Sequence, residues 1–434
     1  MIAISFRTSH SYGDVLRVAA ASVTMTTALA CAHSGAVGAP TPASPPAAAQ
    51  QSTSSAPPAP TNNYWIYVGA ESADLLQRVR FGPEGTVVER TIPVGELPTE
   101  MEGPHGVQIS RDGKYVHMTT GHGSPDGKYW KFELGPDTLV GAPTFLGFFP
   151  ATIDVTPDGL YAFVANFNLH GEMVPSTVSV VYTPTNTEVA QVTTCVMPHG
   201  SRVDPTGLRQ YSACMMDDQL VEIDAAHFQV SRRFSVAKGK EGPIAMSVAS
   251  GEHAGMRHDA AAPMPQGASP TNASAPTDVA PHAMPAATCS PTWAQPSVDG
   301  RKIYVACNKA DEILEIDRDA WAISRRFKTG RGPYNLAVSP DGKMLAATLK
   351  PGASFQLFDL ATGESVFLTK STTTVTNGVV ISPDSRYAFV SSEGVGAAPG
   401  KVDVYDLVAR ARVGTVEVGQ QAGGIAFWRM QAAK

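Results

Sequence analysis

Two features that whole classes of protein depend on are missing from this chain of 434 residues: an excess of basic residues and a long apolar segment in its body. Its 33 Lys and Arg residues are outnumbered by 39 Asp and Glu residues, which gives a net charge of −6. Binding to a nucleic-acid backbone needs a basic surface, so we expect no nucleic-acid partner. Beyond the N-terminal segment, no run approaches the about 18 apolar residues that span a bilayer.

Familiar catalytic signatures are missing as well. The chain has no glycine-rich phosphate loop, no Gly-x-Ser-x-Gly elbow, no His-Glu-x-x-His pair and no Cys-x-x-Cys-His haem attachment site. Each of these patterns places reactive groups at a fixed spacing, so the common routes to those chemistries are not indicated. The sequence therefore favours a protein that binds over one that catalyses.

What the chain does contain is typical of many short strands joined by turns. Charged residues make up 17% of it, and there are 39 Gly and 34 Pro. A turn signature, Ser/Thr-Pro-Asp-Gly or a relative of it, recurs before bursts of alternating apolar residues. Its copies end at Gly113, Gly159, Gly207, Gly300, Gly342 and Ser385, in steps of 46, 48, 93, 42 and 43 residues. A period in the forties with a tight turn between two strands indicates β-propeller blades.

The step of 93 residues contains an insertion and no extra blade. From Ala249 to Thr288 there is one isolated Val and no Ile, Leu or aromatic residue, so no strand pattern can be drawn. The flanks match each other at an offset of 93, as in Leu220-Val221-Glu222-Ile223-Asp224 against Ile313-Leu314-Glu315-Ile316-Asp317. Residues 244–288 are predicted to be a His-, Met-, Pro- and Ala-rich loop between consecutive blades.

Six signatures give six blades, and the two chain ends supply the seventh. Gly424-Ile425-Ala426-Phe427-Trp428 is predicted to be an innermost strand, and Tyr64-Trp65-Ile66-Tyr67-Val68 the second strand of the same blade. Pairing them leaves no free sheet edge between the first and last blades. We predict an all-β fold, a seven-bladed β-propeller over residues 63–430 closed by its N- and C-terminal strands, and we expect a monomer.

The N-terminal residues are predicted to be a secretion signal followed by a linker. An apolar, small-residue run from Val18 to Ala30 is typical of a signal peptide over residues 1–31. Its end also resembles a bacterial lipoprotein box with Cys31 as the lipidated residue, although Ala28 stands where a larger aliphatic residue is usual. Residues 32–62 read as a disordered linker. We expect a periplasmic or cell-surface protein that touches the membrane only through a lipid anchor on Cys31, with plain secretion as the alternative.

The repeat also carries a family resemblance. Phe163-Val164-Ala165-Asn166 and Tyr304-Val305-Ala306-Cys307-Asn308 resemble the Tyr-Val-Thr-Asn repeat of the YVTN or YncE-like family of extracytoplasmic seven-bladed propellers. The resemblance covers nearly all of the chain from Asn63 to Met430. It implies the fold and the compartment, but this family includes binding proteins and surface proteins, so it implies no substrate.

The repeat places residues in two columns around the predicted channel. One column, at the ends of second strands, contains Thr120, Asn166, Cys214, Cys307, Leu349 and Ser392. The other, at the starts of innermost strands, contains Pro104-His105, Pro150-Ala151, Pro198-His199, Pro291-Thr292, Pro333-Tyr334, Asn377 and Gly423. An antiparallel hairpin brings these two positions together, so both columns are predicted to lie at one mouth of the channel.

Four cysteines form two pairs with nearly the same spacing, one pair in each of two consecutive repeats. In a secreted protein they predict two disulfides, Cys195 with Cys214 and Cys289 with Cys307. The alternative is that Cys214 and Cys307 face one another as thiolates and bind a soft metal such as Cu(I), with Met215 beside them and His199 as a further candidate ligand.

Histidines indicate a site at the same mouth. We predict that His105, His122, His170 and His199 lie there, with Tyr334 and Asn377 as further ligand-binding residues. Because the blade that carries Ala151 separates His105 from His199, only a wide site or a bridging ligand is expected to use both. The insertion adds His253, His258 and His282 among methionines, and imidazole with thioether suits copper. His117 stands where other blades have an aromatic residue, so we expect it to pack between sheets.

Three functions follow in order of preference. The first is a binding module that recognises a small ligand, copper or an extracytoplasmic protein partner at the channel mouth. The second is a copper-dependent oxidoreductase, because the two Pro-His pairs are reminiscent of the histidine ring in propellers of the nitrous-oxide-reductase kind. The third is a lactonase-like hydrolase, for which Glu102, Arg202 and His199 would supply the Glu, Arg and His.

Overall fold

A computed structural model describes residues 57–97, 99–122, 127–169, 171–246 and 286–434. The predicted signal peptide, nearly all of the linker, Cys31, His170 and most of the insertion, including His253, His258 and His282, lie outside these residues. The secondary structure of the described part is almost entirely β, with one short 3-10 helix at Glu71–Ala73. No helix in those ranges is long and apolar enough to cross a membrane.

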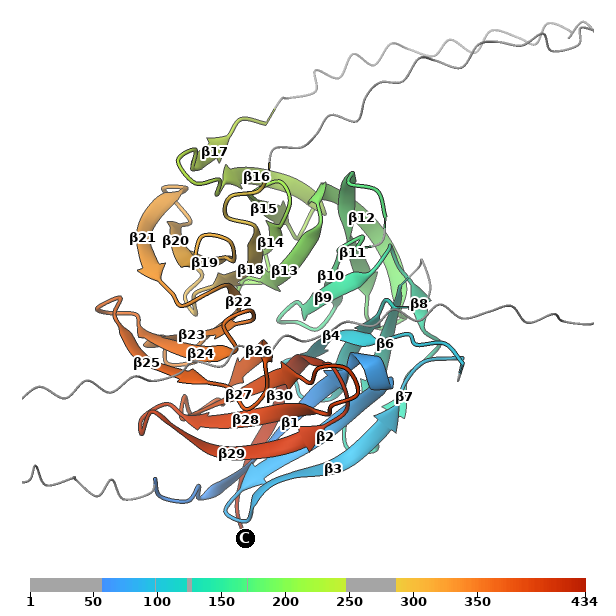
Figure 1. Ribbon diagram of the computed structural model, residues 1–434. Helices are drawn as coiled ribbons and strands as arrows, with labels where there is room; N and C mark the ends of the chain where they lie inside the picture. Colours follow the sequence, from blue (N-terminus) through green and yellow to red (C-terminus); the bar gives the residue numbers. More distant parts are fainter. Residues whose placement is uncertain (1–56, 98, 123–126, 170, 247–285) are drawn as a thin grey trace, which may run out of the picture. The chain divides into compact units, whose positions relative to one another are not determined.

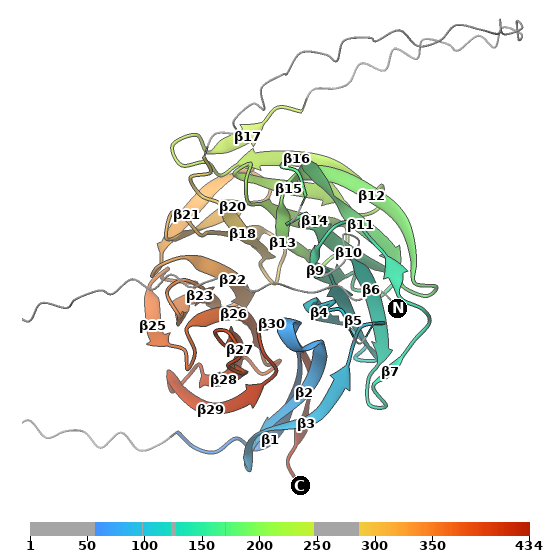
Figure 2. The ribbon, with the colours of Figure 1, turned by 45° about the vertical axis from the view of Figure 1, so that its right-hand side comes forward.

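Seven antiparallel sheets form seven blades (Figures 1 and 2), here numbered in the chain order of their innermost strands. From the inside outward, blade 1 contains β4 (Pro104–Ile109), β5 (Tyr115–Thr120), β6 (Lys128–Glu133) and β7 (Thr138–Leu139), and β8 (Thr144–Phe145) pairs with β6 as β7 does. Blade 2 contains β9 (Pro150–Val155), β10 (Tyr161–Asn166), β11 (Pro175–Tyr182) and β12 (Thr187–Val196). Blade 3 contains β13 (Pro198–Val203), β14 (Arg209–Cys214), β15 (Gln219–Asp224), β16 (Gln229–Ser235) and β17 (Gly242–Ile244).

Blades 4 to 7 follow the same order. They contain β18 (Pro291–Pro296), β19 (Lys302–Cys307), β20 (Glu312–Asp317) and β21 (Ala322–Lys328); β22 (Pro333–Val338), β23 (Met344–Leu349), β24 (Ser354–Asp359) and β25 (Ser365–Lys370); β26 (Val375–Ile381), β27 (Tyr387–Glu393), β28 (Gly400–Asp406) and β29 (Ala411–Val418); and β30 (Ala422–Ala432), β1 (Asn62–Ala70), β2 (Leu75–Gly82) and β3 (Gly85–Pro93).

The predicted closure is confirmed. Strand β30 pairs antiparallel with β1, with Ile425 opposite Val68, and β1 pairs in turn with β2. Each innermost strand contacts the innermost strand of the next blade, and β30 contacts β4, so the seven blades form a closed ring. The first and last elements of the propeller therefore hold each other in one sheet.

The recurrent turn signature has a local physical basis. In its first copy, the Ser110 hydroxyl donates to Asp112 and accepts from the Tyr115 amide, at 2.6 and 3.0 Å. Gly113 adopts a φ of +69°, which glycine reaches without strain, and Ser385 adopts a φ of +57° at the same place in blade 6. The side chains of the signature thus close the turn between the innermost and second strands of a blade.

Side-chain hydrogen bonds to main-chain carbonyls join the blades around the channel, and we call this set the inter-blade belt. At six of the seven junctions, a side chain of one blade donates to a carbonyl oxygen at the start of the next blade's innermost strand. These bonds are His105 Nδ1 to Ala151, Thr152 to His199, His199 Nδ1 to Thr292, Thr292 to Tyr334, Thr348 to Asn377 and Ser391 to Gly423. At the seventh junction the backbones approach so closely that a Cβ on Gly424 would lie 2.0 Å from the His105 carbonyl oxygen.

Both predicted disulfides are confirmed. Cys195 of β12 is bonded to Cys214 of β14, which links blades 2 and 3, and Cys289 is bonded to Cys307 within blade 4. The alternative of a thiolate metal site at Cys214 and Cys307 is wrong for this structure, because each sulfur is already bonded to another cysteine and all four residues are buried. Two such bonds indicate an oxidising, extracytoplasmic environment.

A buried carboxylate holds the chain where it re-enters blade 4. Asp218, in the turn after β14, accepts hydrogen bonds from the amides of Thr288, Cys289 and Ser290 and from the Thr288 hydroxyl. Asp218 is 5% exposed, so these bonds lie away from water. A charged acceptor with several main-chain donors is among the stronger hydrogen-bond arrangements in proteins.

We expect Asp218→Ala to lower the free energy of unfolding by about 3 kcal/mol, because it leaves buried amides without an acceptor. Urea denaturation followed by tryptophan fluorescence measures this loss. Asp319→Ala is the control, since the Asp319 side chain is 75% exposed and makes a surface ion pair with Arg318; it should cost less than about 1 kcal/mol. Equal losses for both variants would contradict the role given to Asp218.

A thiol count tests the disulfides directly. In protein without residues 1–31, denatured under non-reducing conditions, we expect no titratable thiol, and reduction should release the four thiols of the two bonds. Free thiols before reduction, in protein purified from an oxidising compartment, would contradict the pairing. They would support a thiolate metal site at Cys214 and Cys307 instead.

Candidate functional site

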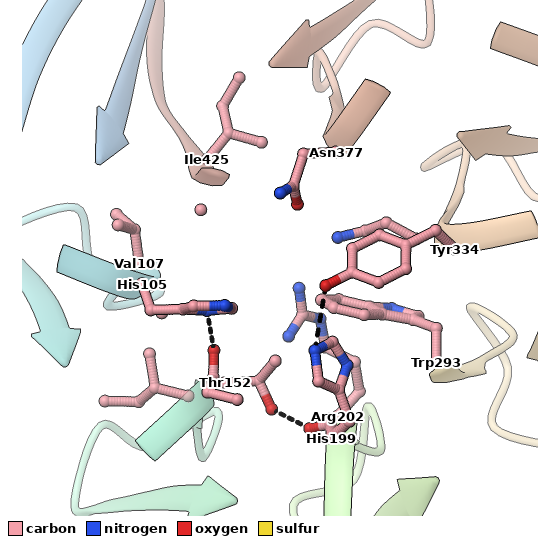
Figure 3. Close-up of a pocket in the computed structure, with 14 residues that line it drawn as sticks. His105, Val107, Thr152, His199, Arg202, Trp293, Tyr334, Asn377 and Ile425 are labelled. Carbon is pink, nitrogen blue, oxygen red and sulfur yellow. Dashed lines mark hydrogen bonds between the residues drawn. The ribbon is translucent and has the colours of Figure 1, made fainter. Parts of the chain in front are cut away.

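The starts of the innermost strands surround a small cavity in the central channel (Figure 3). It has a volume of about 30 Å³. Its lining comes from all seven blades and consists of His105, Gly106, Val107, Ala151, Thr152, Ile153, His199, Arg202, Trp293, Tyr334, Asn335, Asn377, Gly424 and Ile425. A space of this size holds about two water-sized groups, so it suits a small molecule or the end of a larger one.

The register confirms that both predicted columns lie at one mouth. Pro104 pairs with Thr120, and Pro198, Pro291 and Pro333 pair with Cys214, Cys307 and Leu349 respectively. Polar residues that are far apart in the sequence therefore surround one opening.

His105 and His199 meet directly, which the sequence did not indicate. They belong to blades 1 and 3, yet their ring centroids are 6.1 Å apart. Blade 2 contributes only the small, fully buried Ala151 at the matching position, so nothing bulky separates the two imidazoles. No wide site or bridging ligand is needed to bring both rings to one place.

The belt determines which nitrogen of each imidazole carries hydrogen. Nδ1 of His199 lies 2.9 Å from the Thr292 carbonyl oxygen, which can only accept, so Nδ1 is the donor. Nε2 of His199 is 3.0 Å from the Tyr334 hydroxyl, which donates to it. Burial, with the nearby positive charges of His105 and Lys350, lowers the pKa of His199 to about 3. His199 is therefore neutral near pH 7 and orients the Tyr334 hydroxyl.

Nδ1 of His105 is likewise committed to the belt, at 2.6 Å from the Ala151 carbonyl oxygen. Its Nε2 consequently points away from the belt, 3.6 Å from a carboxylate oxygen of Glu71. The His105 ring also packs edge-on against Phe149. Blade 1 thus presents an imidazole edge whose orientation is set by blade 2.

Glu71 is a site residue that the sequence analysis missed. It lies on the short helix between β1 and β2, is 2% exposed, and accepts hydrogen bonds from His122 Nε2 and Gln421 Nε2, both at 2.9 Å. Burial alone would raise the pKa of Glu71. The positive charge of His105, the hydrogen bond from His122 and the charge of Lys350 outweigh burial and lower that pKa. Glu71 is therefore ionised and buried at the mouth.

A second charged group lies on blades 5 and 6. Lys350 Nζ is 2.8 Å from a carboxylate oxygen of Glu393 and 4.5 Å from the centre of the Tyr334 ring. Asn377 Nδ2 donates to the same Glu393 oxygen at 2.6 Å. Burial would lower the pKa of Lys350, but Tyr334 and Glu393 raise it overall, so the ammonium stays charged. The Asn377 amide is held at the cavity by this pair.

Glu71, Lys350 and Glu393 occupy one position of the repeat. Each stands one residue after its own blade's position in the second-strand column. Blades 1 to 4 have Gly121, Phe167, Met215 and Asn308 there. Extending the column by one residue would have found Lys350 and Glu393. Glu71 was hidden because blade 7 has no turn signature from which to count.

Other predicted site residues have different roles. His117 is buried, as expected, with Nδ1 2.7 Å from the Tyr129 hydroxyl. Met215 packs on an apolar cluster with Phe149 and Phe167. Glu102 does not join Arg202 and His199, because its carboxylate bonds to Lys128 and to the Glu96 amide. In the described ranges, no group of three or more His, Cys, Asp and Glu residues is arranged to hold a metal ion.

Comparison with known proteins supports the fold only. No protein-family model matches the chain, and no curated protein matches its sequence, so the YVTN resemblance rests on the repeat residues alone. Solved structures that resemble it include the periplasmic gluconolactonase PpgL of Pseudomonas aeruginosa (TM-score 0.59, 15% identity, 85% of this chain and 99% of that chain); a functionally unknown protein of Desulfotomaculum acetoxidans DSM 771 (0.58, 14%, 84% and 98%); and the Kuenenia stuttgartiensis hydrazine synthase (0.52, 16%, 76% and 91%).

The buried state of His199 makes stability depend on pH. The unfolded imidazole binds a proton near pH 6.5, whereas the folded one does so only near pH 3. The unfolded state therefore holds more protons between these values, and stability falls as the pH is lowered through this window. We expect His199→Gln to flatten this decline by about 1.4 kcal/mol per pH unit.

Urea denaturation at a series of pH values between 7 and 4 measures the decline. Tyr334→Phe is the matched control, because it keeps the buried imidazole and should keep the slope. An unchanged slope in His199→Gln would show that His199 is not held neutral.

Proposed function

We propose that this protein is an extracytoplasmic binding module that takes a small polar ligand at the mouth of its central channel. The observation that carries the proposal is the convergence of His105, His199, Tyr334 and Asn377 on one small cavity. Each of these four polar groups is oriented by a hydrogen bond within the protein, so the site is formed before a ligand arrives. Preorganisation of this kind reduces the entropic cost of binding.

The size and polarity of the cavity favour a small ligand over a protein partner. Its walls alternate apolar side chains, such as Val107, Ile153 and Ile425, with the polar groups above. Such mixed walls are typical of ligand sites in which a few polar contacts set specificity. Two disulfides agree with a protein that works outside the cytoplasm.

The enzyme alternatives have less support. The gluconolactonase that shares this fold is similar at 15% identity, which carries no activity over to this chain. The hydrolytic trio fails to assemble because Glu102 is bound to Lys128. Copper binding through the insertion remains a prediction, since His253, His258 and His282 lie outside the described residues.

A thermal-shift screen tests the proposal. The panel contains small carboxylic acids, sugars, lactones, amines and copper(II). We expect at least one class to raise the melting temperature of the wild type by a few degrees at about 100 times its Kd. Tyr334→Phe and Asn377→Ala should abolish or strongly reduce that shift, because each removes one oriented polar group from the cavity.

His227→Gln is the control for a histidine away from the channel, since its side chain is 70% exposed and bonds to Asp224. It should respond to ligand as the wild type does. A panel with no stabilising compound, or equal shifts in the cavity variants and the wild type, would refute the proposed site. A shift from copper alone would favour the metal hypothesis.

A further inference from the structure

One lining residue of the cavity is unlike its counterparts elsewhere in the molecule. Arg202 lies near the end of β13, three residues beyond His199, and its guanidinium points into the channel (Figure 3). The guanidinium stacks on Trp293, with Cζ 4.5 Å from the ring centre. Among the described residues it makes no ion pair, and its one hydrogen bond runs from Nη1 to the Ser201 carbonyl oxygen at 2.9 Å.

The other arginines that stack on aromatic rings show what is missing at Arg202. Arg232 over Trp321 pairs with Glu222, and Arg325 over Phe327 pairs with Glu315. Arg78 pairs with Asp137 and Arg386 with Asp406, while Arg429 is exposed to water. Arg202 alone of this set is turned inward without a carboxylate.

The carboxylate that attracts Arg202 makes no ion pair with it. Asp154 of β9 attracts Arg202, but its two oxygens already accept from Gln108 Nε2 and from the amides of Val155 and Val203. Burial lowers the pKa of Arg202, and the attraction of Asp154 offsets this only in part. Arg202 is part-buried, and its remaining guanidinium N–H groups make no hydrogen bond within the described residues, so they can donate to an anion.

A second donor in the cavity wall is also without a partner. Trp293 is 4% exposed, and its Nε1 has no hydrogen-bond partner among the described residues. The indole N–H can only donate, so it needs an acceptor. The cavity wall therefore carries a part-buried cation that makes no ion pair and a buried neutral donor that has no acceptor among the described residues.

We propose that the ligand taken at this mouth is a small carboxylate, held by the Arg202 guanidinium in the channel. The planar guanidinium fork matches the two oxygens of a carboxylate, and such paired, charge-assisted bonds are specific in geometry. A cavity of about 30 Å³ has room for a carboxylate group. This proposal rests on the function proposed above and adds the chemical class of the ligand.

Isothermal titration calorimetry with acetate tests it, with acetamide as the neutral molecule of nearly the same shape. We expect the wild type to bind acetate and not acetamide, and Arg202→Gln to bind acetate about tenfold to a hundredfold more weakly. Arg232→Gln is the matched control, since it removes a guanidinium that stacks on a tryptophan outside the cavity, and it should bind acetate as the wild type does.

Arg202→Lys is a second variant that tests the same residue if Arg202→Gln does not fold. It keeps the positive charge but loses the fork, so it should bind acetate more weakly than the wild type while still preferring it to acetamide. Equal binding of acetate and acetamide, or undiminished acetate binding in either folded Arg202 variant, would overturn the assignment of the carboxylate to Arg202.

The failure of this inference is distinguishable from failure of the proposed function. If acetate and formate do not bind but a neutral compound stabilises the wild type and not Tyr334→Phe, the carboxylate assignment falls and the binding module stands. If neither acetate nor any panel compound binds, both fall.

Discussion

The structure depends on the inter-blade belt, in which a side chain of one blade donates a hydrogen bond to a carbonyl oxygen of the next. These carbonyls lie at the starts of the innermost strands. On the channel side of an innermost strand there is no further strand of the same sheet whose amides could donate to these oxygens. Buried main-chain groups must find partners, so the belt satisfies them and sets the spacing of the blades around the channel. Two of its donors are imidazoles. Because their Nδ1 atoms are used by the belt, their Nε2 atoms are directed to other groups at the mouth, Glu71 for His105 and Tyr334 for His199.

The same constraint organises the charges near the channel. Glu71 accepts hydrogen bonds from His122 and Gln421, and Glu393 pairs with Lys350. The neutral His199 holds the Tyr334 hydroxyl, so it contributes orientation and no charge at pH 7. Against this paired background Arg202 stands out, because it lines the cavity without an ion pair among the described residues.

Much of the fold could be predicted from the sequence, because its signals are local and repeated. The Ser/Thr-Pro-Asp-Gly turn, the pairing of chain ends and the duplicated cysteine spacing each state a geometry that the chain cannot easily realise in another way. The mouth was predictable only in part. Columns placed His105, His199, Tyr334 and Asn377 there, but Glu71 follows no turn signature. The contact of His105 with His199 depends on the small size of Ala151, and the isolation of Arg202 depends on Asp154 being occupied. Such properties arise between blades and leave no pattern along the chain.

The channel is proposed to receive an anion, and a crystal structure of the acetate complex tests this most directly. We expect acetate in the cavity, with both carboxylate oxygens on the Arg202 guanidinium and with His199 Nδ1 still bonded to the Thr292 carbonyl oxygen. A channel without acetate, with Arg202 turned onto Asp154 and the belt bonds of His105 and His199 broken, would contradict the account.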